Sequence, residues 1–153
     1  MKYGKRAKIL FCSVLCLIPA YALFLIFAWS AFDVADVSRN SAMYHFAVPA
    51  HLRSVDLVLE CRSPSYRWKG WDGAGVPFSS LNYGSSASTA DLFKIYRSKF
   101  MQQSCRTEIL TLPAESEQLL RMGCTNEDFL EVKIFVTEKG GCNNVTVDFL
   151  DND

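Results

Sequence analysis

An uncharged run from Ile9 to Phe32 constrains this chain more than any other feature of its sequence. As a helix that rises about 1.5 Å per residue, the run would reach roughly 36 Å, which exceeds the ~30 Å hydrocarbon core of a bilayer. Four basic residues precede it, and the acidic residue Asp33 ends it. The length of the run predicts a membrane-spanning signal anchor at 9–32. Because basic residues favour the cytoplasmic side, we expect segment 1–8 in the cytoplasm and the residues after 32 outside it.

A cleaved signal peptide is the main alternative for this segment. Residues 9–18 could serve as its apolar region, and Pro19, Ala20 and Ala22 resemble a small-residue cleavage site. Cleavage there would leave an apolar amino terminus that water solvates poorly, so the uncleaved anchor is favoured. We therefore expect a single-pass protein of a cell membrane, such as the bacterial inner membrane, with a periplasmic or extracellular carboxyl-terminal domain.

Four cysteines lie after the apolar run, namely Cys61, Cys105, Cys124 and Cys142. In a small exported domain, an even set of cysteines predicts disulfides, here two bridges with three possible connectivities. Zinc is the competing interpretation, but no two of the four have the spacing of a zinc knuckle. We expect disulfides, and neither a metal nor another cofactor.

The charge of the exported part narrows the class of partner. The four basic residues ahead of Ile9 are a quarter of the chain's 16, whereas all 16 acidic residues follow residue 32, so the exported part is acidic. Nucleic-acid binding needs a basic surface that neutralises phosphates. The composition therefore argues against a nucleic-acid partner.

The residue pattern predicts an α+β domain at 48–153, preceded by a polar stalk at 33–47. Alternating apolar residues predict a first strand at 55–61, and a long loop follows at 62–88. A helix is expected from Thr89 to Gln103, because Ser88 can cap it and Asp91 stands three residues later. A β-meander is expected after the helix, with strands at 105–112, 119–125, 131–138 and 143–150. The helix is expected to pack on one face of an antiparallel sheet.

The strand pattern also predicts how the cysteines pair. If 105–112 and 119–125 form a hairpin that turns after Pro113, Cys105 and Cys124 lie directly opposite each other. That pairing leaves Cys61, at the end of the first strand, for Cys142, at the start of the last one. The predicted bridges are therefore Cys105–Cys124 and Cys61–Cys142.

The predicted loop at 62–88 holds the best candidates for partner binding. It is long for a compact domain, and it combines Trp and Tyr with Arg, the residue types that dominate binding hot spots. The candidates are Tyr66, Arg67, Trp68, Lys69 and Trp71. They could bind a protein or stack on an envelope glycan. Alternatively they lie at lipid headgroups, or their rings belong to the core.

Catalysis finds little support in the sequence, and no catalytic residue is predicted. The chain has two histidines, His45 and His51, and no nucleophile or metalloprotease motif accompanies them. Both are interpreted as ordinary surface residues. The triplet at 144–146 matches the acceptor pattern for N-glycosylation at Asn144.

The leading hypothesis is a single-pass membrane protein whose disulfide-stabilised exported module binds a protein or envelope partner. In a second hypothesis, the chain is an accessory subunit of a membrane complex that is recognised through its transmembrane helix. An envelope enzyme is the third hypothesis, with His51 as one of its few candidate residues.

Overall fold

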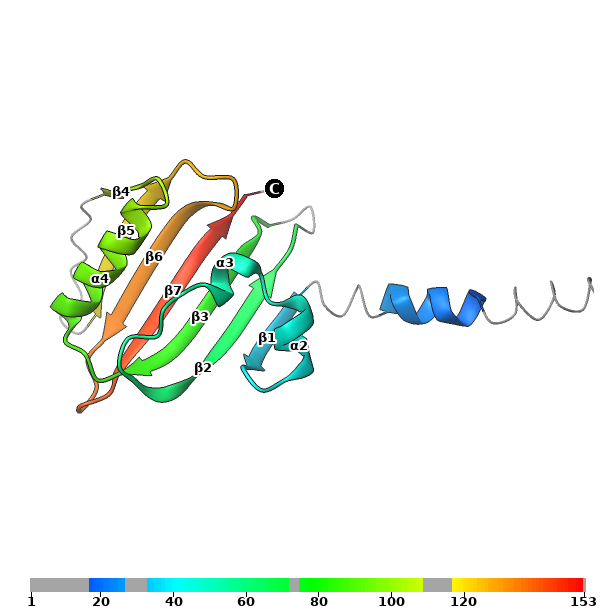
Figure 1. Cartoon of the computed structure of the whole chain (residues 1–153), viewed down its shortest axis with the longest axis horizontal. Helices are drawn as coiled ribbons and strands as arrows, with labels where there is room; N and C mark the ends of the chain where they lie inside the picture. Colours follow the sequence, from blue (N-terminus) through cyan, green and yellow to red (C-terminus); the bar gives the residue numbers. More distant parts are fainter. Residues whose placement is uncertain (1–16, 27–32, 72–74, 109–116, 153) are drawn as a thin grey trace, which may run out of the picture. The chain divides into compact units, whose positions relative to one another are not determined.

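The structure, a computed structural model, describes residues 17–26, 33–71, 75–108 and 117–152. The chain divides into two compact units, 1–32 and 33–153. In the first unit, residues 17–26 form a helix, drawn in blue in Figure 1, with exposed apolar side chains. Within the described ranges, no helix is long and apolar enough to cross a membrane. The other parts of the predicted span, 9–16 and 27–32, lie outside the described residues.

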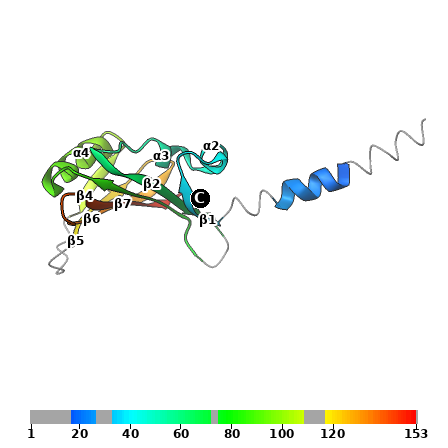
Figure 2. The same cartoon turned by 90° about the horizontal axis from the view of Figure 1, so that it is seen from below.

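The second unit is built on a seven-stranded antiparallel sheet with the order β1-β2-β3-β7-β6-β5-β4 (Figure 1). Its strands are β1 (Asp33–Ser38), β2 (Glu60–Lys69), β3 (Phe78–Ser85), β4 (Cys105–Glu108), β5 (Glu117–Cys124), β6 (Phe129–Thr137) and β7 (Asn143–Asp151). The helices are α2 (Ala42–Ala47), α3 (Ala50–Arg53) and α4 (Thr89–Met101). All three lie on one side of the sheet (Figure 2), which confirms the predicted α+β class.

The core lies between the helices and the sheet face that they cover. Alternate side chains of β6 and β7 point into it, as the period of two predicted. These fully buried side chains include Val132, Ile134, Val136, Val145 and Val147. The residues between them lie on the opposite face of the sheet, which we call the open face, and are half-buried to exposed.

Helix α4 begins where the sequence predicted. The backbone N–H of Asp91 donates to Ser88 Oγ at 3.2 Å, and the Ser88 hydroxyl donates to the Asp91 carboxylate at 2.6 Å. This arrangement satisfies a donor that the first helical turn would otherwise leave unpaired. The helix ends at Met101, two residues before the predicted boundary, and buries Leu92 and Phe100.

The predicted first strand at 55–61 is wrong. Helix α3 ends at Arg53, and the chain follows an irregular path until β2 begins at Glu60. Val55 is buried, but Leu59 is exposed and has a φ of +43°. The apolar residues of this segment alternate without sharing one buried face, so their spacing did not indicate a strand.

The predicted loop at 62–88 is also wrong, because it contains most of β2 and all of β3. The two strands pair as an antiparallel hairpin, with Tyr66 opposite Leu81 and Lys69 opposite Phe78. Two irregularities in the register of β2 and two fully buried serines of β3, Ser79 and Ser85, hide the apolar alternation.

Residues 33–47 belong to the domain and do not form the predicted stalk. They fold as β1, which pairs with β2, and as α2. Val37 is buried, and the Tyr44 ring lies 4.9 Å from the Tyr66 ring. Val34, Met43 and Ala47 also pack against the core, so the segment is part of the domain, which begins at residue 33.

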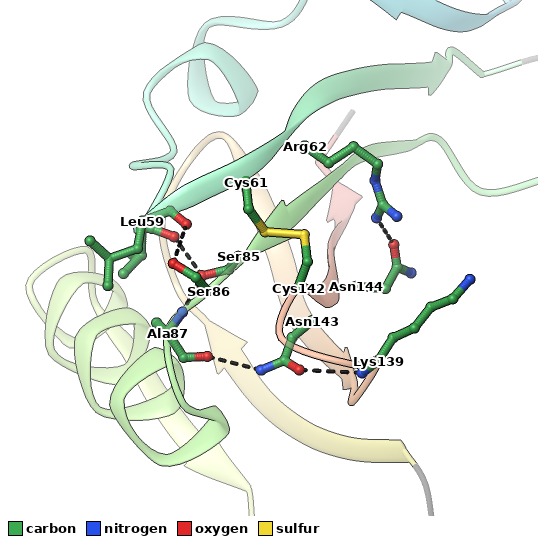
Figure 3. Close-up of a disulfide and its surroundings, with 11 residues drawn as sticks. Leu59, Cys61, Arg62, Ser85, Ser86, Ala87, Lys139, Cys142, Asn143 and Asn144 are labelled. Atoms are coloured by element: carbon green, nitrogen blue, oxygen red, sulfur yellow. Dashed lines mark hydrogen bonds between the residues drawn. A yellow bond between two sulfur atoms is a disulfide. The ribbon is translucent and has the colours of Figure 1, made fainter.

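Both predicted disulfides are confirmed. Cys105 and Cys124 face each other in the β4–β5 register, and Cys61 is bonded to Cys142 across 81 residues (Figure 3). Figure 3 also shows Asn144 beside this bridge, where its side-chain oxygen accepts a hydrogen bond from Arg62.

Candidate functional site

The five predicted partner-binding residues do not form one surface. Tyr66 and Trp68 are 2% and 6% exposed and belong to the core under the helices. Arg67 points to the open face, where its guanidinium carbon lies 4.9 Å from the centre of the Phe78 ring. Lys69 and Trp71 lie where β2 ends, at the start of the β2–β3 connection.

Trp68, Lys69 and Trp71 nevertheless meet at one depression, which we call the hairpin groove. It has a volume of about 520 Å³, within the range of sites for small ligands. The residues that give it chemical character are His51, Trp68, Lys69, Trp71, Asp128 and Asp151. Aromatic rings therefore stand beside charged groups, and Trp71 is 55% exposed.

His51 ties α3 to two strands at the base of this groove. Its Nε2 atom lies 2.7 Å from Ser79 Oγ and 3.1 Å from Asp151 Oδ1, and the Ser79 hydroxyl donates to the same Asp151 oxygen at 2.9 Å. The imidazole ring also packs 5.0 Å from the Phe149 ring. The interpretation of His51 as an ordinary surface residue was wrong, whereas His45 is exposed.

The trio of Ser79, His51 and Asp151 does not have the geometry of a serine nucleophile and its base. In such sites the serine is accessible, and the carboxylate holds the ring nitrogen that faces away from the serine. Here Ser79 is fully buried, and both partners meet the same nitrogen of His51. The arrangement instead links α3, β3 and β7.

The open face carries interacting charges near the middle of the sheet. Burial raises the pKa of Asp148, although Ser80 donates to its carboxylate at 2.5 Å and Lys133 lies nearby. Burial acts in the same direction on Glu131, but hydrogen bonds from Arg121 and Lys133 outweigh it and lower the pKa of that carboxyl. The opposite charges of these side chains therefore partly offset one another on the open face.

A larger depression of about 1020 Å³ lies between α4 and the segment 56–59. Its described lining consists of polar side chains, such as Lys94 and Gln102, and a few aliphatic ones, without an aromatic ring. Lys99 bridges it by donating to the Asp56 carboxylate at 2.8 Å. The hairpin groove is the better candidate because it combines aromatic surface with converging charges.

Sequence reasoning found only part of the groove. His51, Asp128 and Asp151 come from distant segments, and only the closure of the sheet brings them near Trp71. The one available signal in the sequence was Asp151, an acidic residue at the end of the last strand. Within the described ranges, no group of three or more His, Cys, Asp or Glu side chains is placed to hold a metal ion.

Comparison of the chain with protein-family models, with curated proteins and with solved structures gives no match.

Proposed function

We propose that this chain is a single-pass membrane protein whose exported, disulfide-bonded domain binds a partner protein in the hairpin groove. The apolar run at 9–32 is the proposed anchor, with the amino terminus in the cytoplasm. Two disulfides support an oxidising location for the domain, such as the periplasm or the cell exterior.

The observation that carries the binding role is the exposed ring of Trp71 beside two carboxylates. Asp128 and Asp151 line the same groove, and the whole domain is acidic. A lysine or arginine side chain of a partner could stack on the indole and pair with Asp128. The groove thus favours a protein partner with an exposed basic side chain over an uncharged glycan.

The test is affinity purification of the full chain from membranes after cross-linking, with Trp71→Ala as the variant. Loss of a hot-spot residue worth about 2 kcal/mol should weaken capture by roughly tenfold or more. Leu59→Ala is the matched control, because Leu59 is also a large exposed apolar residue, 65% exposed, and lies outside the groove. Equal capture by both variants would overturn the proposal.

Two further variants test its other parts. Asp128→Lys should reduce the capture of a basic protein partner, because it replaces an attractive charge by a repulsive one. The capture of an uncharged glycan should change much less. Replacement of residues 9–32 by an unrelated membrane anchor should preserve capture. Loss of capture on that replacement would instead favour recognition through the transmembrane segment.

A further inference from the structure

The register of the sheet places the start of the domain beside the β2–β3 hairpin. Asp33 is paired with Lys69, and Lys69 is paired with Phe78, so these residues form one row across β1, β2 and β3. We call this end of the sheet the hairpin end. Figure 1 shows β1 next to β2 along the outer edge of the sheet.

The hairpin end holds the residue that follows the apolar run in the sequence. Asp33 is bonded directly to Phe32, the last residue of that run. Neighbouring strands lie about 5 Å apart, and each strand residue adds about 3.3 Å. The backbone of Trp71, two residues beyond Lys69, therefore lies within about 10 Å of Asp33.

Large apolar side chains are exposed on both sides of the hairpin connection. Trp71 follows β2 and Val76 precedes β3, and each is 55% exposed. Tryptophan is enriched at the headgroup level of membranes, because its ring is amphipathic. With the apolar run in a bilayer, both side chains come within reach of the headgroups, a layer several ångströms thick.

The charges at the hairpin end indicate which lipids suit it. Lys69 stands among Asp33, Asp128 and Asp151 in the paired row and the groove lining. This excess of carboxylates would be repelled by an anionic surface but not by zwitterionic headgroups that present an ammonium group.

From these observations we infer that the hairpin end rests on the surface of the bilayer that holds the anchor, with Val76 and the outer edge of Trp71 among zwitterionic headgroups. The inference depends on the proposed anchoring. It adds that the hairpin groove lies close to the membrane surface. A partner would then have to reach the groove at the membrane surface.

The test uses the full chain in nanodiscs of phosphatidylethanolamine and phosphatidylcholine, with a photo-reactive amino acid at one position at a time. Val76 is the test position, since it does not line the groove. Leu59 is the control for exposure, at 65% against 55% for Val76. Phe24, in the helix of residues 17–26, is the control for anchoring.

We expect lipid adducts at Phe24 and Val76, with a yield at Val76 several-fold above that at Leu59. Adducts at Phe24 with equal yields at Val76 and Leu59 would overturn this inference and leave the anchored binding module standing. Protein adducts in place of lipid at Val76 would overturn it as well, because the surface would then belong to a protein interface. An absence of lipid adducts at Phe24 would overturn the anchoring and the inference together.

Discussion

A methyl group on Gly84 would stand 2.6 Å from the Sγ atom of Cys142, closer than real side chains approach each other. The same methyl would lie 2.6 Å from the Arg62 Cβ atom. We therefore expect Gly84→Ala to lower the free energy of unfolding by about 1–3 kcal/mol, the usual cost of overpacking. Urea denaturation of the oxidised protein measures this loss.

A double-mutant cycle tests whether the contact with the disulfide causes part of this loss of stability. In a Cys61→Ala, Cys142→Ala background, one of the two close contacts of the new methyl group disappears. The cost of Gly84→Ala should therefore be smaller there than in the wild type. Costs that agree within about 0.5 kcal/mol would contradict the predicted contact.

The two disulfides should differ in their contribution to stability. Cys61–Cys142 closes a separation of 81 residues, and Cys105–Cys124 one of 19. The chain-entropy model assigns about 4.5 kcal/mol to the longer loop and about 3 kcal/mol to the shorter one. Paired Cys→Ala variants, compared by urea denaturation, should show the larger loss for the 61–142 bridge. The reverse order would mean that native contacts outweigh loop closure.

The hydroxyl groups of Tyr83 and Tyr96 lie 2.6 Å apart in the core, and the Tyr96 hydroxyl donates to the Asp56 carbonyl oxygen at 3.0 Å. Tyr96→Phe removes the hydrogen bonds that the Tyr83 hydroxyl and the Asp56 carbonyl oxygen make with the Tyr96 hydroxyl. We therefore expect the free energy of unfolding to fall by about 1–3 kcal/mol. Tyr21→Phe, in the separate amino-terminal unit, should leave the thermal unfolding of the domain unchanged. A loss below about 0.5 kcal/mol would show that the pair contributes little.

The same tyrosines should make the domain sensitive to alkali. Burial raises the pKa of Tyr96 and of Tyr83 above the ordinary value of about 10. A raised pKa in the folded state gives stability that is complete below pH 10 and is lost as the pH rises further. The part of the tyrosinate absorbance that comes from Tyr83 and Tyr96 should therefore appear together with unfolding.

Two carboxyls of the open face should respond to pH in opposite ways. The folded-state pKa of Asp148 is raised by burial, so its contribution to stability is complete below the unfolded value of about 3.9 and is lost as the pH rises. The pKa of Glu131 is lowered, against the effect of burial, by Arg121 and Lys133, so its contribution is present above about pH 4.3 and is lost as the pH falls.

At pH 7 we therefore expect Asp148→Asn to stabilise the domain and Glu131→Gln to destabilise it. Both differences from the wild type should shrink towards pH 3. Urea denaturation at the two pH values measures them, and a stabilising Glu131→Gln at pH 7 would contradict the role of the ion pairs.

The meander and α4 could be predicted because each carries a complete local signal. Val132, Ile134 and Val136 alternate without interruption, and Ser88 with Asp91 caps the helix. The hairpin register predicted the Cys105–Cys124 bridge, and the Cys61–Cys142 bridge then followed by elimination. Where the local pattern and the tertiary packing agree, the sequence is sufficient to predict the element.

The β2–β3 hairpin was missed because its buried face is partly polar. Ser79 and Ser85 are fully buried, and their hydroxyls are satisfied by His51, Asp151 and the Val58 carbonyl oxygen. An apolar pattern cannot reveal a buried serine whose partners come from other segments. The hairpin groove was missed for the same reason, since its walls come together only when the sheet forms.

The Cys61–Cys142 bridge also determines how the domain would carry mechanical load. Tension from an anchor would reach the sheet at Asp33, in the edge strand β1, whose hydrogen bonds to β2 could open one after another. Unravelling from that side could release residues 33–60, but at Cys61 the load would pass through the disulfide to Cys142. A pull between the anchor and the carboxyl-terminal end would therefore bypass everything between these two cysteines, so β3, β6 and α4 would stay folded under a force that strips the edge.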